Sequence, residues 1–357
     1  MPERILISAG GTVGHVAPAL AVADELVRRG AHVEFAGTPD RIEAELVPAR
    51  GYAFHPFRVS GLPRRPGPAL VRALGRAVRA PSACLGIIDR VRPDAVFGGG
   101  GYVAGPMVAA ARRRRIPCAL SEADARLGLA NRLAAPLADR VMLAFPVAGL
   151  EPPKYVVTGR PVDAAFGTAD RAAARAGLGV ADGERLVVCF GGSLGAGPLN
   201  DALRGAYPDG PPAGTRVLLV TGRGKGRVGA CPERFAEIEF SDRMPALLAA
   251  ADLVVARAGG SVAEVAAAGR AAILVPWAGA ADDHQSLNAA PFRALGAAVV
   301  IGDAELTAAG LRAEIDGILA DDARRRGMEQ AMRGLARPDA ARAMADILLA
   351  LARREAA

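Results

Sequence analysis

The chain has 357 residues, of which 51% are hydrophobic and only 4% aromatic. This length fits two domains of roughly 100–200 residues each, and the hydrophobic content excludes a disordered protein. Its 4 cysteines lie far apart without a CxxC pair, which disfavours a disulfide scaffold or structural zinc and fits a reducing compartment. Without a run of about 18 apolar residues or a signal-peptide pattern after Met1, we expect a cytoplasmic protein with no spanning helix.

Positive charge is concentrated in the first half of the chain, whose overall net charge is +7. Residues 1–163 carry 22 basic and 14 acidic side chains, a net of +8, whereas residues 164–357 carry 22 and 23, a net of −1. An anionic partner of the first half, such as a phosphate or a membrane surface, would explain this difference. A general arginine bias is the alternative, because only Lys154 and Lys225 are lysines.

Short apolar runs alternate with alanine-rich helical stretches, which is typical of a parallel sheet covered by helices. In the first half we predict strands at 4–9, 32–37, 94–97, 118–120, 141–144 and 156–158, and helices at 17–29 and 42–50. In the second half we predict strands at 185–190, 217–221, 238–240, 253–256 and 272–275, a helix from about Pro198 and another at 340–354.

Each half opens with a strand, a glycine-rich loop and a helix. This repetition predicts an α/β protein of two Rossmann-like domains with parallel sheets, whose strand ends face each other across a ligand-binding cleft. We expect the boundary near 159–170, which assigns residues 1–160 to the first domain and 161–340 to the second. The C-terminal helix (341–357) could dock on either domain, and we expect it to return to the first.

The first glycine segment is SAGGTVGH at 8–15, directly after the first predicted strand. Its glycines let backbone N–H groups approach an oxyanion, and the start of a helix adds positive potential. It matches neither GxGxxG nor the Walker sequence, which disfavours dinucleotide and P-loop sites. His15 could act as a base near neutral pH, or it could be a structural residue that caps the turn.

Two further glycine segments follow predicted strands. The segment GGGGYVAGP at 98–106 could wrap a phosphate at an entropic cost, or it could be merely a flexible loop. The segment GGSLGA at 191–196 has N–H groups and the Ser193 hydroxyl to offer a second phosphate.

Two polar segments complete the set of five. In RAGGSVAE at 257–264, Glu264 lies in the first turn of the next predicted helix, where it could favour the helix dipole or accept hydrogen bonds from a ribose diol. In DDHQSLN at 282–288, Gln285 and Asn288 share a helix face. Their amides suit sugar hydroxyls, although amides also cap helices.

The order and content of these five segments resemble the MurG family over nearly the whole chain, although no single segment is specific. The resemblance implies the GT-B architecture and an inverting hexosyltransferase, an N-acetylglucosaminyltransferase of peptidoglycan synthesis. It would move GlcNAc from UDP-GlcNAc to undecaprenyl-diphosphate-MurNAc-pentapeptide (lipid I), forming lipid II. It also implies a peripheral position on the cytoplasmic face of the cell membrane, roles in cell shape and division, no cofactor, no obligatory metal and no nucleic-acid partner.

The resemblance also assigns residues by position. The donor set is Thr12, Val13, Gly14, Asp124, Ser193, Ser241, Met244, Ser261, Val262, Ala263, Glu264, His284, Gln285 and Asn288. The acceptor-diphosphate set is Gly11, Gly14, Gly100, Gly101, Tyr102 and Gly105. Within the donor set, Met244 falls in the uracil-pocket segment, Glu264 matches the ribose-binding glutamate, and the last three residues match the positions that hold the GlcNAc hydroxyls. His15 is the preferred catalytic base and Glu122 the alternative.

Three segments depart from the family pattern. SEAD at 121–124 replaces the usual HEQN, so Glu122 is kept and Asp124 stands where an amide is usual. GRPVD at 159–163 replaces GNPVR, so an arginine is missing at Asp163 and Arg160 could supply its charge. The segment 257–264 is one residue shorter than the commoner form. These departures leave open a different lipid or natural-product acceptor, and also a silent UDP-sugar-binding homologue.

Two basic features suit a membrane-bound acceptor. In the predicted helix 69–80, the residues Arg72, Arg76 and Arg79 share one face, and Leu70, Val71, Leu74 and Val78 share the opposite face. Residues 112–115 are four consecutive arginines. A basic amphipathic helix can lie on an anionic lipid surface, whereas the alternative is an ordinary surface helix whose apolar face packs on the core.

Overall fold

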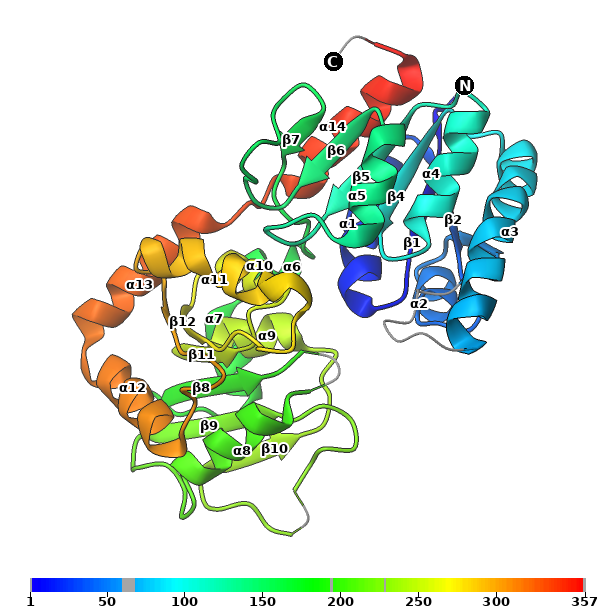
Figure 1. Cartoon of the computed structure of the whole chain (residues 1–357). Coiled ribbons are helices and arrows are strands. Elements are labelled where there is room, and N and C mark those ends of the chain that lie inside the picture. The colour runs from blue at the N-terminus through cyan, green and yellow to red at the C-terminus, as the bar shows by residue number, and fades with distance from the viewer. Residues whose placement is uncertain (1, 60–67, 193–194, 228, 356–357) are drawn as a thin grey trace. The chain divides into compact units, whose positions relative to one another are not determined.

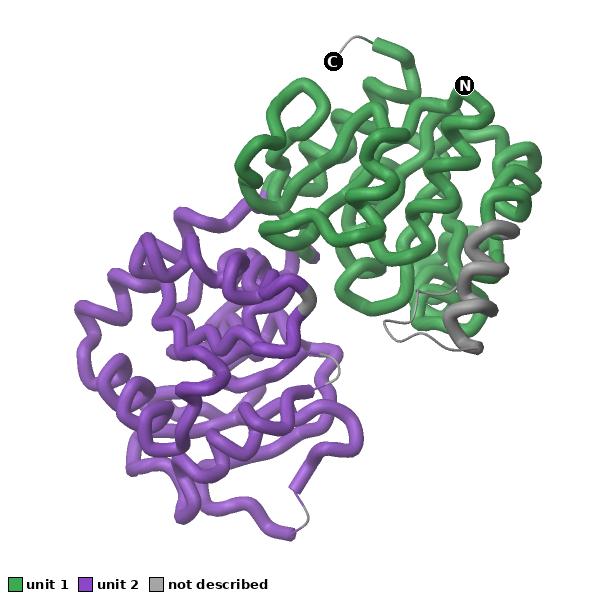
Figure 2. Tube along the Cα trace, viewed as in Figure 1, with its two compact units in different colours: residues 1–162, 339–357 green, residues 163–338 purple. Residues whose placement is uncertain are grey.

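The computed structural model describes residues 2–59, 68–192, 195–227 and 229–355, without the side chains of residues 68–79 and Ala281. The chain forms two compact units (Figure 2). The N-terminal unit comprises residues 1–162 together with 339–357, and the C-terminal unit comprises residues 163–338. Among the described residues, no helix is both long and apolar enough to cross a membrane. All four cysteines are free thiols in this structure.

The N-terminal unit is built on a seven-stranded parallel sheet in the order β3-β2-β1-β4-β5-β6-β7 (Figure 1). The strands are β1 (Arg4–Ala9), β2 (His32–Gly37), β3 (Ala53–Pro56), β4 (Ala95–Gly100), β5 (Cys118–Glu122), β6 (Arg140–Leu143) and β7 (Tyr155–Val157). The strand order reverses between β1 and β4, and ligands of such sheets bind beyond the carboxyl ends of the strands at this reversal.

Helices cover both faces of this sheet because its central strands are apolar on both sides. The helices are α1 (Val13–Arg28), α2 (Glu43–Ala49), α3 (Pro68–Val91), α4 (Ala104–Arg113), α5 (Leu129–Ala134), the 3-10 turn η1 (Ala135–Leu137) and α14 (Ala340–Arg353). Ile5 and Ile7 pack in a cluster with α1 and α14, whereas Leu6 packs with residues of α3 and α4. The C-terminal helix α14 therefore belongs to the core of the N-terminal unit.

The C-terminal unit repeats this plan with a six-stranded parallel sheet in the order β10-β9-β8-β11-β12-β13. The strands are β8 (Arg185–Phe190), β9 (Thr215–Val220), β10 (Phe235–Ile238), β11 (Leu253–Ala256), β12 (Ala271–Leu274) and β13 (Ala298–Val300). The helices are α6 (Ala165–Thr168), α7 (Arg171–Gly177), α8 (Gly197–Ala206), α9 (Met244–Ala250), α10 (Val262–Ala268), α11 (His284–Ala294) with the preceding turn η2 (Ala281–Asp283), α12 (Ala308–Ala320) and α13 (Asp322–Leu335). Here the order reverses between β8 and β11.

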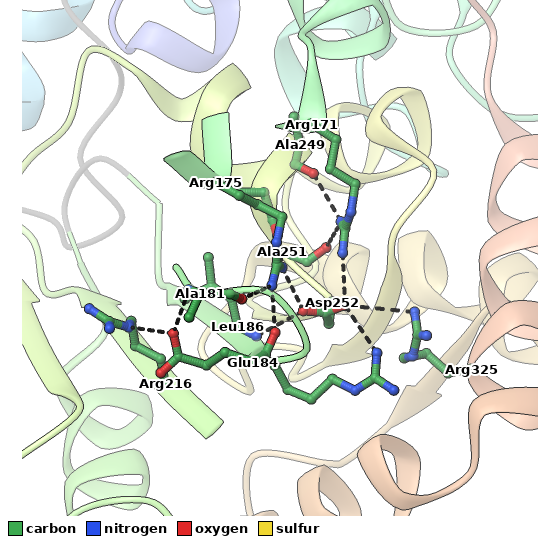
Figure 3. Close-up of polar contacts among 12 residues, drawn as sticks. Arg171, Arg175, Ala181, Glu184, Leu186, Arg216, Ala249, Ala251, Asp252 and Arg325 are labelled. Atoms are coloured by element: carbon green, nitrogen blue, oxygen red, sulfur yellow. Dashed lines mark hydrogen bonds and ion pairs between the residues drawn. The ribbon is translucent and has the colours of Figure 1, made fainter. Parts of the chain in front are cut away.

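The amino end of this second sheet is held by one buried carboxylate, that of Asp252, directly before β11 (Figure 3). It accepts a hydrogen bond from the Leu186 N–H at 2.8 Å. Four guanidinium groups lie within ion-pair distance of it: Arg171 at 2.8 Å, Arg175 at 3.0 Å, Arg185 at 3.7 Å and Arg325 at 3.9 Å. These arginines come from α7, β8 and α13, so the cluster ties two helices to the starts of two central strands.

The predicted parallel α/β class and the alternation of strands and helices are confirmed. One strand was predicted in the wrong place: the expected 238–240 lies instead at Phe235–Ile238. The reason is burial, because Phe235 is 4% exposed and anchors the strand, whereas Phe240 is 51% exposed. The edge strands β3 and β13 were not predicted. Helix α1 begins at Val13 rather than at residue 17, which places His15 in its first turn.

Candidate active site

Two glycine loops of the N-terminal unit meet beyond the carboxyl ends of β1 and β4, at the reversal of strand order. The Gly10 N–H donates to the Gly100 carbonyl at 3.3 Å. Gly101 has a φ of +77°, and a Cβ atom on it would lie 2.2 Å from the Gly10 carbonyl oxygen. Side chains at these positions would push the loops apart, so the glycines serve close backbone packing rather than flexibility.

Helix N-termini and an aromatic ring surround these loops. Helix α1 follows Thr12, its N-cap residue, and α4 follows Val103, so positive ends of two helix dipoles lie beside the same loops. Gly105 is in the first turn of α4. The Tyr102 ring packs on the first loop, since a Cβ on Gly11 would lie 3.0 Å from it. The arrangement suits an anion such as a diphosphate.

His15 projects from the first turn of α1 against the second loop. Its Nδ1 lies 3.2 Å from Thr12 Oγ1, and a Cβ on Gly100 would lie 2.7 Å from its Cδ2. Burial lowers the pKa of His15 most, and the positive charge of Arg160 lowers it further; Asp124, the Gly10 backbone and Glu43 act in the opposite direction. The imidazole is therefore neutral at neutral pH, so one of its two ring nitrogens can accept a proton, and the tautomer decides which nitrogen that is.

Arg160 lies at the same helix end. Its Nη2 donates to the Gly14 carbonyl at 2.5 Å, so the guanidinium sits against the first turn of α1. Arg160 thus brings positive charge to the first glycine loop. That Arg160 also supplies the charge of the arginine missing at position 163, near the donor, stays a prediction. Asp163, where the family has arginine, accepts a hydrogen bond from the Ala165 N–H at 2.9 Å and belongs to the start of α6.

Glu122 is buried and bound by donors from its own segment. Its carboxylate accepts hydrogen bonds from Asp124 N at 3.1 Å, Gly128 N at 2.8 Å and Asn131 Nδ2 at 2.9 Å. Burial raises the pKa of Glu122, and these three hydrogen bonds oppose the rise. The carboxylate holds the 122–128 loop at the start of α5. The described donors to Glu122 therefore come from its own segment and from the start of α5.

A second buried carboxylate in this unit, Glu43, was missed in the sequence. Its side chain is 0% exposed, and Oε2 accepts from the Gly11 N–H at 3.0 Å. Its Oε1 accepts from the backbone N–H of Thr38 at 3.1 Å and from the Thr38 hydroxyl at 2.5 Å. The Gly11 N–H is thus engaged within the protein and is not directed at an acceptor diphosphate. In the sequence Glu43 looks like an ordinary acidic residue of a helical first turn.

In the C-terminal unit the fourth and fifth sequence segments lie together. Asn288 is buried, and its Nδ2 donates to the Ala258 carbonyl at 3.2 Å. Gln285 Oε1 accepts from the Trp277 N–H at 2.9 Å, and a Cβ on Gly259 would lie 3.8 Å from its Nε2. Asn288 therefore fixes the loop after β11, while Gln285 lies at its border, partly exposed. Glu264 lies in the first turn of α10, as the sequence predicts.

The loop after β8 is pinned to the loop after β9. A Cβ on Gly195 would lie 2.0 Å from the Thr221 carbonyl oxygen, and Asn200 Nδ2 donates to that oxygen at 2.9 Å. Lys225 Nζ donates to the Gly195 carbonyl at 3.2 Å. Ser193 lies outside the described residues. The loops after β8 and β11 thus flank the reversal of strand order in this unit, as the two glycine loops do in the other.

The remaining predicted residues occupy helix starts. Met244 begins α9, and Ser241 Oγ accepts from the Arg243 N–H at 3.0 Å. The residues at the starts of α10 and α11 are Ser261, Val262, Ala263 and His284. The residues predicted to contact the membrane lie in the first turns of α3, where side chains are outside the description, and they are Leu70, Arg72, Leu74, Arg76, Val78 and Arg79. Within the described part of the chain, no three His, Cys, Asp or Glu side chains gather as metal ligands would.

Comparison with known proteins identifies both units. Residues 5–143 match the glycosyltransferase family 28 N-terminal domain, and residues 186–344 match the C-terminal domain of the same family. A protein of Mycobacterium tuberculosis H37Rv is 41% identical over 98% of this chain and 89% of its own length. Its name is UDP-N-acetylglucosamine–N-acetylmuramyl-(pentapeptide) pyrophosphoryl-undecaprenol N-acetylglucosamine transferase. The protein of the same name from Paenarthrobacter aurescens TC1 is 38% identical over 98% of this chain and 96% of its own length.

A solved structure agrees with these relatives. The crystal structure of Acinetobacter baumannii MurG superposes with a TM-score of 0.76 and 29% sequence identity, covering 98% of this chain and 99% of that one. Similarity of this extent covers nearly the whole of both chains. The chain therefore belongs to glycosyltransferase family 28, in its MurG group of N-acetylglucosamine transferases with the two-domain GT-B fold.

Proposed function

We propose that this chain transfers GlcNAc from UDP-GlcNAc to lipid I and so forms lipid II in peptidoglycan synthesis. The names of its full-length relatives support the donor and the acceptor. The observation in the chain itself that carries the proposal is the position of His15, in the first turn of α1 between two interlocked glycine loops. A base beside an anion-binding loop is what an enzyme needs to activate a hydroxyl of a diphosphate-linked sugar.

The reaction is a direct displacement at the anomeric carbon of GlcNAc. The 4-hydroxyl oxygen of the acceptor forms the new bond, its proton passes to the unprotonated ring nitrogen of His15, and the bond from the anomeric carbon to the UDP oxygen breaks. The electron pair of that bond leaves with UDP, so the anomeric configuration inverts. A neutral His15 is suited to this step because its pKa is lowered by burial and by Arg160.

The C-terminal unit holds the donor at the reversal between β8 and β11. Leaving UDP gains negative charge, and the loop N–H groups and the starts of α8 and α10 supply positive potential to stabilise it. Glu264 accepts hydrogen bonds from the ribose diol, and Gln285 contacts the GlcNAc hydroxyls. Asn288 acts on the donor through the Ala258 carbonyl that it binds.

The acceptor places the enzyme on the cytoplasmic face of the cell membrane as a peripheral protein, because the undecaprenyl chain stays in the bilayer. The first turns of α3 and the arginines at the end of α4 provide the contact with anionic lipid. Arg112 and Arg113 lie in the last turn of α4, while Arg114 pairs with Asp89 at 2.6 Å. Roles in cell shape and division follow from this place in cell-wall synthesis.

Transfer of radiolabelled GlcNAc from UDP-GlcNAc to a short-chain lipid I analogue, with UDP release followed in parallel, tests the proposal. We expect label in the acceptor and an equal amount of UDP, both dependent on the acceptor. UDP-GlcNAc binding without transfer would contradict the proposal. It would indicate another lipid or natural-product acceptor, or a silent homologue, and a panel of aglycones in the same assay separates these two.

A further inference from the structure

The turn between β1 and α1 is held from behind by the Glu43 carboxylate. Strands β1 and β2 are parallel neighbours, with Ser8 opposite Ala36, so Gly11 and Thr38 follow their strands at the same edge of the sheet. Helix α2 begins at Glu43 and directs its carboxylate between these two strand ends. One oxygen binds the Gly11 N–H and the other binds Thr38 twice, so the carboxylate bridges the two turns.

Two glycines make room for this carboxylate. A Cβ on Gly10 would lie 2.2 Å from Glu43 Oε1, and a Cβ on Gly37 would lie 2.8 Å from Glu43 Cγ. The glutamate side chain thus fits between the two strand ends, because both ends carry glycine and both turns supply hydrogen-bond donors to its carboxylate. A charged acceptor that receives three such hydrogen bonds holds its donors more firmly than a neutral one.

The turn that Glu43 holds comes directly before the helix start that carries His15. Gly11 is followed by Thr12, the N-cap of α1, and Thr12 Oγ1 faces His15 Nδ1. A shift of the Gly10–Gly11 turn would therefore move the helix start, the imidazole and the interlocked second loop together. A displacement of about 1 Å at such a site can lower the rate about 100-fold.

We propose that Glu43 is a positioning residue of the transfer reaction: it orients the Gly11–His15 segment through the Gly11 N–H and supplies negative charge near the imidazole. This inference rests on the proposed function of the same site. The charges that act on the pKa of His15 are those of Arg160, Asp124 and Glu43 itself. Of these, Arg160 lowers the pKa of His15, and both carboxylates raise it.

The sign of the pH effect follows from these charges. Removing the charge of Glu43 leaves Arg160 less opposed, so the pKa of His15 falls further. Because His15 must be unprotonated to accept the hydroxyl proton, the acid limb of the kcat/KM profile moves to lower pH. A residue that only stabilised the fold would leave this limb in place.

The test compares Glu43→Gln with Glu45→Gln, an exposed glutamate of the same first helical turn. The glutamine keeps the size of Glu43 but turns an N–H group toward the Gly11 or the Thr38 N–H. We expect kcat about 100-fold lower in Glu43→Gln, with the acid limb at lower pH and UDP affinity unchanged. Glu45→Gln should match the wild type in all three. Glu43→Asp keeps the charge but is one methylene shorter, so it should lower kcat and leave the acid limb near its wild-type position.

A second readout is independent of transfer. The chain has 4 histidines, so the His15 imidazole can be assigned and titrated by NMR in the wild type and both glutamine variants. A lower pKa of His15 in Glu43→Gln, but not in Glu45→Gln, supports the proposal for Glu43. This readout does not need transfer activity, so a wild type that transfers no GlcNAc would contradict only the proposed function. Wild-type kcat and an unmoved His15 titration in folded Glu43→Gln would overturn the inference. If Glu43→Gln does not fold, Thr38→Val replaces it in the test, because it removes the hydroxyl donor to the same carboxylate. Thr38→Val should also lower kcat, and an unchanged kcat would overturn the inference.

Discussion

Glu43 and Asp252 are buried carboxylates with opposite partners. Glu43 is 0% exposed, lies beyond the carboxyl ends of β1 and β2, and binds backbone N–H groups and one hydroxyl. Asp252 is 2% exposed, precedes β11 at the amino end of its sheet, and has four guanidinium neighbours. In parallel α/β sheets ligands bind at the carboxyl ends of the strands. Glu43 therefore lies at the ligand-binding end of its sheet, and Asp252 lies at the opposite end of the other sheet.

The donors to Glu43 are uncharged, so they do not neutralise the carboxylate, and its negative charge raises the pKa of His15. The arginines around Asp252 instead neutralise it and attach α7 and α13 to the sheet. The comparison indicates that the first cluster serves the reaction and the second serves stability. If so, changes in the first should act mainly on turnover, and changes in the second should act mainly on stability.

The largest effect is expected at His15. The change His15→Ala removes the base, so kcat should fall about 10²–10⁴-fold while the melting temperature stays near that of the wild type. Glu122→Gln disturbs a loop rather than the base, and its kcat should fall less. Steady-state GlcNAc transfer and thermal unfolding measure both quantities. Near-normal turnover in His15→Ala would remove His15 from the mechanism, and a greater loss in Glu122→Gln would transfer the role to that carboxylate.

The next effect concerns stability alone. Asp252→Asn leaves buried arginines without their shared counter-ion, and the free energy of unfolding should fall by about 3–5 kcal/mol. Asp322 shares Arg185 and Arg325 with this cluster, but its side chain is 44% exposed, so Asp322→Asn should cost only about 1 kcal/mol or less. Urea unfolding gives both values. KM for UDP-GlcNAc should be unchanged in the folded fraction, and a raised KM would mean that the Asp252 cluster also serves the donor site.

The central strands and the glycine loops could be predicted because their signals are local. Strands 4–9, 185–190 and 253–256 are buried on both faces and stand out as continuous apolar runs, and the predicted bounds agree with β1, β8 and β11. The edge strand β3 carries no such run, whereas the short edge strand β13 is apolar throughout and was missed although its signal is local. Residues Ala53–Pro56 are exposed or half-buried along their whole length, which hides the strand in the sequence.

The two carboxylate clusters could not be predicted because their partners meet only in the fold. Glu43 meets Gly11 through the pairing of β1 with β2, and Asp252 meets arginines from three separate elements. Asn288 shows what spacing alone leaves open. Its spacing from Gln285 fits both a pair of sugar-binding amides and a structural role, and in the fold its side chain is buried and donates to the Ala258 carbonyl.

The smallest predicted effect is at Glu25, a carboxylate near the other end of α1. Hydrogen bonds from Arg28 first, and also from Arg29, lower its pKa to about 2. A depressed pKa means that Glu25 stabilises the fold above its ordinary pKa of 4.5 and that this contribution is lost as the pH falls from 4.5 toward 2. Glu25→Gln should therefore cost about 0.5–1 kcal/mol at pH 7, a small value because the Arg28 side chain is 68% exposed.

Urea unfolding of Glu25→Gln and the wild type at pH 7, 4 and 3 measures this contribution and its loss. The difference should shrink as the pH falls and also when salt is added at pH 7, since exposed ion pairs are screened. The cost of Asp252→Asn should resist the same salt, because its ion pairs are shielded from solvent. Equal salt sensitivity in the two variants would mean that burial does not separate them, and the stabilising role assigned to Asp252 would then rest on its hydrogen bond to Leu186 alone.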